Sequence, residues 1–598
     1  MIKTTEQYQP TRWTLDHILA APEGSPVEQA LQDLEAATAT IEQLRPHLLS
    51  DIDVEDFIET MIAIERLSEV TNRLGSYGQL WFTEDTKNQA ALAFMGRMDQ
   101  ILTEAQNRIL FFSLWWKELD DATVARLLAA VNDDWRYHLE LERKFTVHTL
   151  SEAEEKIVNL KDVNGINAIV TLYDMITNKF VFELEIEGEI KPMTRDELMT
   201  HVRSPEAEVR AAAYQKLYEV YEREDSILAQ IYIHRVRDWA TENLKLRHFS
   251  SPLSVRNLAN DIPDTVVETL LDVCAEQTGV FQHYFKLKAG WLGVPRLRRY
   301  DLYAPLSSNS TKKIAYSDAV NIVLNSFGEF SPVVASQAER IFQDRHIDAE
   351  IRPNKRGGAF CASILPGLTP LVLTNYTGEP RQVATLAHEL GHAIHALLAA
   401  DHSVLTFHSA LPMAETASVF SEMLLTDRLL GEEKDPLVRR DLLAEAVDDM
   451  YATVLRQAYF VIFEREAHQM IAEGATMEDL NRKYAENLAQ QFGDSLEISE
   501  DFRREWIAIP HIFHTPFYCY AYSFGQLLAL SLYQQYKDEG ASFTPKLLKI
   551  LAYGGSASPD HILREAGIDI ADPDFWRSGF KVIQGMIDEL SSLSITTS

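Results

Sequence analysis

The stretch PRQVATLAHELGHAIHALLAA, residues 380–400, decides the fold. Pro380 suits the first turn of a helix, and no other proline interrupts the stretch. At about 100° per residue, the valine and the leucines fall on one face, while His388, His392 and His395 fall on the opposite face. The pattern therefore predicts an amphipathic helix that buries its apolar side and presents its histidines.

The motif His388-Glu389-Leu390-Gly391-His392 carries the chemistry of this helix. Two imidazoles four residues apart lie one turn apart, so both can bind one metal ion at about 2.0 to 2.1 Å. Glu389 lies beside them, which suits a general base acting on water at the metal. The alternative is a pair of solvent-facing histidines on an ordinary helix. We favour the metal site, because the motif lies in the helical context that it requires.

A zinc site needs a third protein ligand. His395 is nearest in sequence, but a helix rises about 1.5 Å per residue, so His388 and His395 lie roughly 10 Å apart along the axis. Glu415 is the better candidate, because it lies in a second predicted helix that has Glu415, Ser418 and Glu422 on one face. Two histidines and a glutamate form a catalytic set that leaves the fourth position for water.

Glu422 lies two turns after Glu415 in this predicted helix. We interpret it as a carboxylate that orients a metal-binding imidazole. The alternative is a plain surface or structural carboxylate.

The sequences HELGHAIH, residues 388–395, and ETASVFSE, residues 415–422, resemble the M3 metallopeptidases. The resemblance is closest to the oligoendopeptidase F group, which is related to thimet oligopeptidase and neurolysin. The interval between His392 and Glu415, with 22 residues between them, supports this family. Thermolysin-like and M1 enzymes place their glutamate sooner, near Leu411 or Pro412.

Metzincins are a further class of enzymes with this motif. They require glycine and histidine at the positions that His395 and Leu398 occupy here. The sequence therefore argues against a metzincin.

The resemblance implies a mainly α fold with a zincin-type (gluzincin) catalytic domain. Two short extended segments, residues 357–364 and 371–374, are expected to form a small β-sheet before the metal helix. Two helical halves would flank a deep substrate channel. The expected domains are a helical region at 1–114, an oligoendopeptidase F-type domain with a β-hairpin at 115–195, and the catalytic region at 196–598.

The segment HIFHTPFYCYAYSFG is rich in side chains that donate hydrogen bonds. Its candidates are His511, His514, Tyr518, Tyr520 and Tyr522. Imidazole and phenol groups can stabilise the oxyanion of a tetrahedral intermediate, and the segment resembles the family's histidine- and tyrosine-rich loop. The three tyrosines cannot all share one helix face. We favour His511, Tyr518 and Tyr520 as catalytic residues and leave open whether His511 or His514 is the active histidine.

Other segments are predicted to form helices and a hairpin and carry no obvious catalytic motif. Helices are predicted for residues 26–44, 54–74, 87–112, 205–221 and 264–292, and a hairpin for residues 180–190. Ser204 and Pro205 suit the cap and first position of the fourth of these helices.

Composition narrows the class of protein. The 598 residues are 46% apolar, and 56 basic and 89 acidic residues give a net charge of −33. This charge disfavours nucleic acid and anionic membranes as partners. Three cysteines without CxxC spacing favour a reducing compartment. With no apolar signal core in MIKTTEQYQPTRW, we expect a soluble cytoplasmic protein.

The sequence predicts a zinc-dependent endopeptidase of short oligopeptides. His388, His392 and Glu415 would hold one Zn²⁺ ion per chain, and Glu389 would activate water. One alternative is a metal-dependent carboxypeptidase or other exopeptidase. Another is a non-catalytic helical protein that binds peptides. The sequence leaves the oligomeric state and the cleavage preference open.

Overall fold

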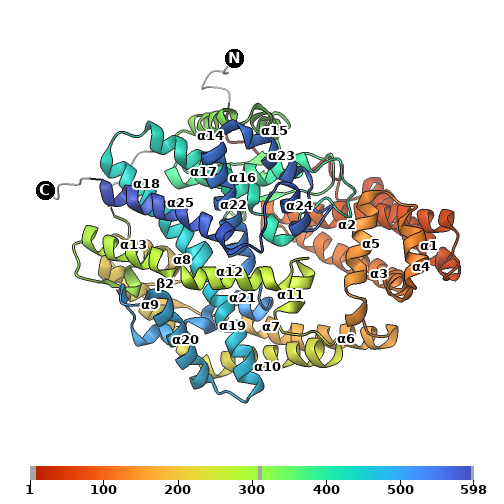
Figure 1. The fold of residues 1–598 in the computed structure, drawn as a ribbon, viewed down its shortest axis with the longest axis horizontal. Coiled ribbons are helices and arrows are strands. Elements are labelled where there is room, and N and C mark those ends of the chain that lie inside the picture. Colours follow the sequence, from red (N-terminus) through yellow and green to blue (C-terminus); the bar gives the residue numbers. More distant parts are fainter. Residues whose placement is uncertain (1–7, 307–312, 594–598) are drawn as a thin grey trace. The chain divides into compact units, whose positions relative to one another are not determined.

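The computed structural model describes residues 8–306 and 313–593. Helices make up most of these residues, and the few strands among them form small sheets, so the predicted mainly α fold is confirmed (Figure 1). Of the described residues, 8–149, 313–428 and 535–568 form one compact unit, called unit 1. Unit 2 consists of residues 150–306, 429–534 and 569–593.

The predicted domains, 1–114, 115–195 and 196–598, stay a prediction. Residues 1–7, 307–312 and 594–598 of these ranges lie outside the described residues.

Unit 1 begins with a group of long helices. They are α1 Ser25–Leu44, α2 Val54–Glu84, α3 Gln89–Glu118, α4 Asp121–Leu128 and α5 Asp133–Lys144. The Asp53 side chain accepts from the backbone N–H of Glu55 at the start of α2, and Asn88 caps α3 in the same way. Their apolar faces form a core with residues of the sheet that precedes the metal helix, including Leu371 and Leu373.

The rest of unit 1 surrounds the metal helix. Its elements are α14 Tyr316–Phe330, α15 Pro332–Gln343, β4 Ile347–Asp348, β5 Phe360–Ala362, β6 Leu371–Leu373, α16 Pro380–Leu398, the first part of α17 Thr416–Glu432, α23 Thr544–Ala552 and α24 Pro559–Glu565. The predicted small sheet is present. Strand β6 lies in its centre, antiparallel to β5 and parallel to β4.

Unit 2 is also mainly helical. Its helices are α6 Glu152–Asn164, α7 Ile166–Thr177, α8 Arg195–Thr200, α9 Ala207–Glu222, α10 Asp225–Trp239, α11 Ser254–Ala259, α12 Asp264–Glu276, α13 Thr278–Trp291, α18 Pro436–Met450, α19 Arg456–Ala472, α20 Met477–Phe492, α21 Pro510–His514, most of α22 Tyr520–Glu539, and α25 Pro573–Ser592. Its strands are β1 Phe182–Ile186, β2 Glu189–Met193, β3 Leu297–Arg298 and β7 Leu496–Glu497.

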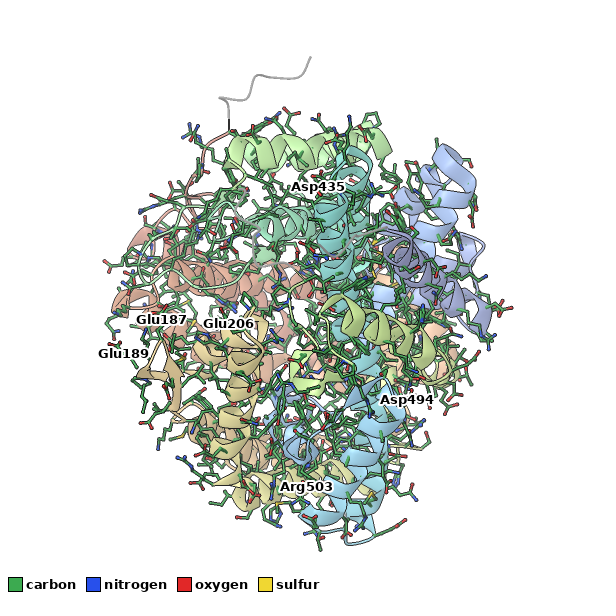
Figure 2. The ribbon with its side chains drawn as sticks, turned by 90° about the vertical axis from the view of Figure 1, so that its left-hand side faces the viewer. Glu187, Glu189, Glu206, Asp435, Asp494 and Arg503 are labelled. Carbon is green, nitrogen blue, oxygen red and sulfur yellow. The ribbon has the colours of Figure 1, made fainter. Side chains whose placement is uncertain are left out.

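Strands β1 and β2 form the predicted hairpin. Glu187 and Glu189, at its turn, are exposed and extend away from the ribbon (Figure 2). Such side chains form the acidic surface that the composition predicts.

One predicted helix in unit 2 is interrupted, and one predicted helix boundary was wrong. The helix predicted for 264–292 is broken at Gln277 into α12 and α13. The predicted cap Ser204 lies too early, because α9 begins at Ala207 and the Ser204 hydroxyl instead accepts from the backbone N–H of Glu206. A serine followed by proline can thus form a turn before a helix rather than its cap.

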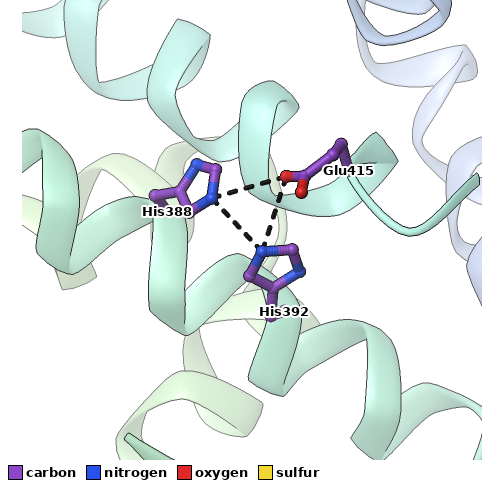
Figure 3. A group of neighbouring side chains, drawn as sticks. All are labelled: His388, His392 and Glu415. Atoms are coloured by element: carbon purple, nitrogen blue, oxygen red, sulfur yellow. Dashed lines mark hydrogen bonds and ion pairs between the residues drawn. The ribbon is translucent and has the colours of Figure 1, made fainter. Parts of the chain in front are cut away.

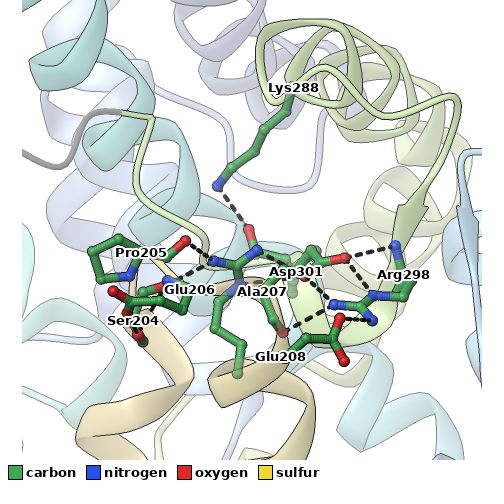
Figure 4. A network of polar contacts seen from close by, with 10 residues as sticks. Ser204, Pro205, Glu206, Ala207, Glu208, Lys288, Arg298 and Asp301 are labelled. Carbon is green, nitrogen blue, oxygen red and sulfur yellow. Dashed lines mark hydrogen bonds and ion pairs between the residues drawn. The ribbon is translucent and has the colours of Figure 1, made fainter. Parts of the chain in front are cut away.

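Buried ion pairs connect helices within unit 2. Asp301 accepts hydrogen bonds from Arg210 on α9 at 2.9 Å and from Arg298 on β3 at 2.9 Å. Lys288 on α13 donates to the Leu302 carbonyl oxygen at 2.8 Å (Figure 4). Because each buried charge has an opposite charge or several hydrogen bonds, the network fixes how these elements pack.

Candidate metal centre

Helix α16 begins where the sequence predicts. Pro380 is in its first turn, and the Gln382 side chain accepts from the backbone N–H groups of Thr377, Gly378 and Glu379 at 2.6 to 3.2 Å. These bonds satisfy donors that a helix start leaves unpaired. The cap fixes the axis of the helix that carries the metal-binding motif.

The two faces of α16 differ as expected, with one exception. Val383, Leu386 and Leu390 are buried, while His388 and His392 are only partly covered. His395, predicted on the histidine face, is 7% exposed and lies in the wall of the metal pocket. The segment containing His408 lines the same wall, and His408 lies close enough to interact electrostatically with His395.

Helix α17 approaches α16 at Gly391. A Cβ atom at Gly391 would lie 2.5 Å from Ser418 Cα and 2.7 Å from the Ala417 carbonyl oxygen. Only glycine fits at such a distance. The close approach brings Glu415, directly before α17, to the histidine face of α16.

His388, His392 and Glu415 direct three ligand atoms at one point (Figure 3). The two Nε2 atoms are 3.2 Å apart, and they lie 3.4 and 3.5 Å from Glu415 Oε2. Tetrahedral ligands at about 2.0 to 2.1 Å from zinc lie about 3.4 Å from one another. The three residues therefore fit a zinc ion in both ligand type and spacing.

Neighbouring groups contact each of these candidate ligands. Glu422 contacts His388 Nδ1, which leaves Nε2 of the same ring to face the other ligands. The Ser418 hydroxyl donates to Glu415 Oε2 at 2.7 Å, and the His392 ring hydrogen-bonds the Ala414 backbone. Glu422 thus makes the kind of contact expected of a carboxylate that orients a metal ligand.

Glu389 lines the same pocket as the three ligands. The pocket has a volume of about 390 Å³, and its other walls come from β5 and from the segment around His408. Burial raises the pKa of Glu389 to about 7. A carboxyl group of this kind can both accept and release a proton near neutral pH.

The other candidate donors lie in unit 2. The rings of His511, Tyr518 and Tyr522 cluster together, with centroids 5.3 to 6.2 Å apart. Tyr520 is set apart from this cluster, because it is fully buried and its hydroxyl accepts from Asn260 at 2.7 Å. Tyr522, which the sequence analysis named but did not favour, lies in this ring cluster, and its four-residue spacing from Tyr518 is the signal of a shared helix face.

The two histidines of this segment also differ. His514 Nε2 is 2.7 Å from Asp174 Oδ1, and its side chain is partly exposed. His511 instead lies beside the tyrosine rings. Its pKa is lowered by burial, which favours the neutral ring.

A second group of carboxylates in unit 2 consists of Asp162, Asp238 and Glu242. Arg247 Nε pairs with Glu242 at 2.7 Å, and Arg235 lies 4.0 Å from Asp238. These cations offset part of the negative charge of the group, and Arg247 is shared with Glu155.

Similarity to known proteins agrees with this geometry. Residues 200–582 match peptidase family M3, and residues 115–182 match the family described as oligopeptidase F. An oligoendopeptidase F homolog of Borreliella burgdorferi is 25% identical, covering 99% of this chain and 100% of the relative. The group B oligopeptidase PepB of Streptococcus agalactiae is 26% identical, and the match covers 98% of this chain and 97% of the relative.

Solved structures share the fold. A Chlamydophila abortus protein superposes with a TM-score of 0.85 at 23% identity, covering 99% of this chain and 100% of the other. The oligoendopeptidase-F of Enterococcus faecium gives a TM-score of 0.73 at 22% identity, and the match covers 95% of this chain and 98% of the other. With a family match over most of its length, the chain belongs to peptidase family M3.

Proposed function

We propose that this M3 peptidase is a zinc-dependent endopeptidase that hydrolyses internal bonds of oligopeptides. Family membership makes it a metallopeptidase. The observation that supports zinc most directly is the spacing of the ligand atoms of His388, His392 and Glu415, 3.2 to 3.5 Å from one another. The names of relatives, oligoendopeptidase F and oligopeptidase, support peptide substrates.

Two imidazoles and one carboxylate are a ligand set typical of catalytic zinc sites. Bound zinc would supply Lewis acidity, which polarises a carbonyl group and lowers the pKa of water. Glu422 holds His388 in the orientation that directs Nε2 to the ion, and Ser418 does the same for Glu415.

Glu389 acts as the general base in this proposal. It lines the pocket of the three ligands without being one of them. Its carboxylate accepts a proton from the attacking water and later delivers that proton to the leaving amine. Burial raises its pKa to about 7, which suits a group that accepts and releases a proton near neutral pH.

The donor roles of His511, Tyr518 and Tyr520 stay predictions. We propose His511 rather than His514, because His514 is engaged by Asp174 while His511 lies beside Tyr518. Of the two tyrosines, Tyr518 is the better candidate, because the hydroxyl of Tyr520 is held by Asn260. Loss of one oxyanion donor is expected to lower the rate on the order of 10²-fold.

The three cysteines support a reducing compartment. Cys274, Cys361 and Cys519 are free. We therefore propose a cytoplasmic location. Among the described residues, no helix has both the length and the apolarity to cross a bilayer.

The test is hydrolysis of an internally quenched peptide that is blocked at both ends. Wild type is expected to cleave it with about one zinc per chain. Glu389→Gln is expected to keep the zinc and lose cleavage, because Glu389 acts on water and not on the metal.

Two results would overturn the proposal. A metal-loaded wild type that leaves the blocked peptide intact but cleaves an unblocked one is an exopeptidase. A Glu389→Gln variant that cleaves at the wild-type rate excludes Glu389 as the base.

A further inference from the structure

A strained turn precedes Tyr518 in unit 2. The Tyr518 backbone N–H donates to the Thr515 carbonyl oxygen at 3.2 Å, which closes a turn with Pro516 and Phe517 at its centre. Phe517 has a φ of 60°, in the left-handed region. The third position of a type II turn requires this conformation and favours glycine. For a bulky residue it costs about 1 to 3 kcal/mol, so surrounding contacts must hold it.

Glu464 on α19 provides the contact at the strained residue. Its Oε1 atom accepts from the Phe517 backbone N–H at 3.0 Å. Both side chains are completely buried, and the Phe517 ring packs against the His468 ring at 4.7 Å between centroids. Residue 517 is therefore held through both its backbone and its ring.

Two arginines donate hydrogen bonds to backbone carbonyl oxygens of the same segment. Arg235 Nε donates to the Phe513 carbonyl oxygen at 3.2 Å, and Arg256 Nε donates to the Pro516 carbonyl oxygen at 3.5 Å. Glu464 thus supplies the acceptor and the arginines supply the donors. Together they determine the path of the chain into Tyr518.

The contact with Phe517 is maintained at an energetic cost. Among the described residues, Glu464 Oε2 has no hydrogen-bond partner. A buried polar atom without a partner costs about 1 to 3 kcal/mol. Burial also raises the pKa of Glu464 to about 8, so the group is mostly neutral at pH 7. An apolar side chain would avoid this cost but could not bind the Phe517 N–H.

We propose that Glu464 is a positioning residue, which holds the Phe517 turn and thereby directs the Tyr518 phenol toward His511. The inference rests on the proposed donor role of Tyr518. The rings of His511 and Tyr518 already lie nearly parallel, with centroids 6.2 Å apart. Glu464 acts through this arrangement and touches no substrate.

The test compares Glu464→Gln with Glu464→Leu, each alone and combined with Tyr518→Phe. Glutamine keeps the acceptor for the Phe517 N–H, so we expect kcat close to wild type. Leucine fills the space but offers no acceptor, so we expect kcat to fall by about 10- to 100-fold. The upper value is the effect expected when one oxyanion donor is lost. We expect KM to change far less. The double variant with Glu464→Leu and Tyr518→Phe should have a kcat no lower than that of Tyr518→Phe alone, because both changes act on the same donor.

Two further variants separate this role from general destabilisation. Asn487→Leu removes a buried donor to the Tyr459 carbonyl oxygen, 3.0 Å away in the same unit, and should lower stability with kcat unchanged. Glu464→Met also lacks an oxygen acceptor for the Phe517 N–H and should lower kcat in the same way. It replaces Glu464→Leu in the comparison if that variant does not fold.

The outcomes are distinct. Wild-type kcat in Glu464→Leu, or in Glu464→Met where it is used instead, overturns the positioning role, as does an additive effect with Tyr518→Phe. Wild-type kcat in Tyr518→Phe instead refutes the donor role of Tyr518, and with it the inference. Zinc-dependent endopeptidase activity would stand in either case.

Discussion

Gly391 lies against the backbone of Ser418, so closely that a Cβ atom would come within 2.5 Å of Ser418 Cα. The two residues lie on α16, which carries the proposed ligands His388 and His392, and on α17, which the proposed ligand Glu415 directly precedes. Glu415 can reach the two histidines because Gly391 has only a hydrogen atom as its side chain, so α16 and α17 can pack closely. Gly391 thus helps to form the candidate metal centre although it offers no ligand atom.

Replacing Gly391 with alanine should therefore disrupt zinc binding. The added methyl group must push α17 away, at a cost of about 1 to 3 kcal/mol, and Glu415 moves with it. We expect zinc per chain after dialysis to fall well below one. The matched control is Gly328→Ala on α14, where the new Cβ would meet only Ala335 at 3.8 Å. It should bind zinc as wild type does and gain up to about 1 kcal/mol of stability.

Glu422 should tune zinc affinity through His388. Glu422→Ala removes the contact to Nδ1, so the ring loses its fixed orientation and some basicity. Zinc affinity, measured by competition with a chelator, is expected to fall by about 10- to 100-fold. Asp427→Asn on the same helix is the control, because Asp427 pairs with Lys537 at an exposed position. Equal affinities in both variants would make Glu422 a structural carboxylate.

The grouping of His388, His392 and Glu415 at the candidate metal centre was predictable because its signals are local. Four-residue spacing gives the histidine pair, and the same periodicity gives Glu415 and Glu422 one face. The approach of α17 at Gly391 was not predictable, because it depends on how two helices pack. Strand β4 was missed for a similar reason, since its two residues pair with β6 across more than twenty positions of sequence.

The tyrosine segment, residues 511–525, shows what sequence periodicity alone cannot predict. The sequence gives Tyr518, Tyr520 and Tyr522 at alternate positions, which does not reveal where a helix begins. In the structure α22 begins at Tyr520, after the turn at Phe517. A left-handed phenylalanine has no sequence signature, because glycine is the residue expected there.

His402 should stabilise unit 1 in a pH-dependent way. Its Nδ1 faces Asp134 at 2.9 Å and its Nε2 faces the Ala552 carbonyl oxygen at 2.8 Å. Both partners accept hydrogen bonds, so the ring satisfies both only when it is protonated. The bond to Asp134 raises the pKa of His402 above 6.5, and Asp401 contributes in the same direction. Bonds from His402 and Ser403 outweigh burial and lower the pKa of Asp134.

The sign of the effect follows from these shifts. The His402 contribution is complete below about pH 6.5 and disappears as pH rises through the folded pKa, while that of Asp134 disappears in acid. His402→Gln should therefore lower the unfolding temperature more at pH 5.5 than at pH 9. The control is His561→Gln, which removes an exposed pair with Glu565 and should have little effect at either pH. A His402→Gln effect that is equal at both pH values would contradict the charged pair.

Glu464 should make unit 2 less stable as pH rises. Burial raises the pKa of Glu464 from about 4.5 in the unfolded chain to about 8, so the unfolded chain releases the proton first. Stability is then lost between about pH 4.5 and pH 8, by roughly a few kcal/mol in total. Its charged neighbours Arg235 and Arg256 do not titrate in this range, and burial lowers the pKa of His468 to about 3. Glu464→Gln should match wild type in unfolding temperature at pH 5 and exceed it at pH 8. If the two proteins lose stability in parallel over this range, the buried carboxyl group is not the source of the pH dependence.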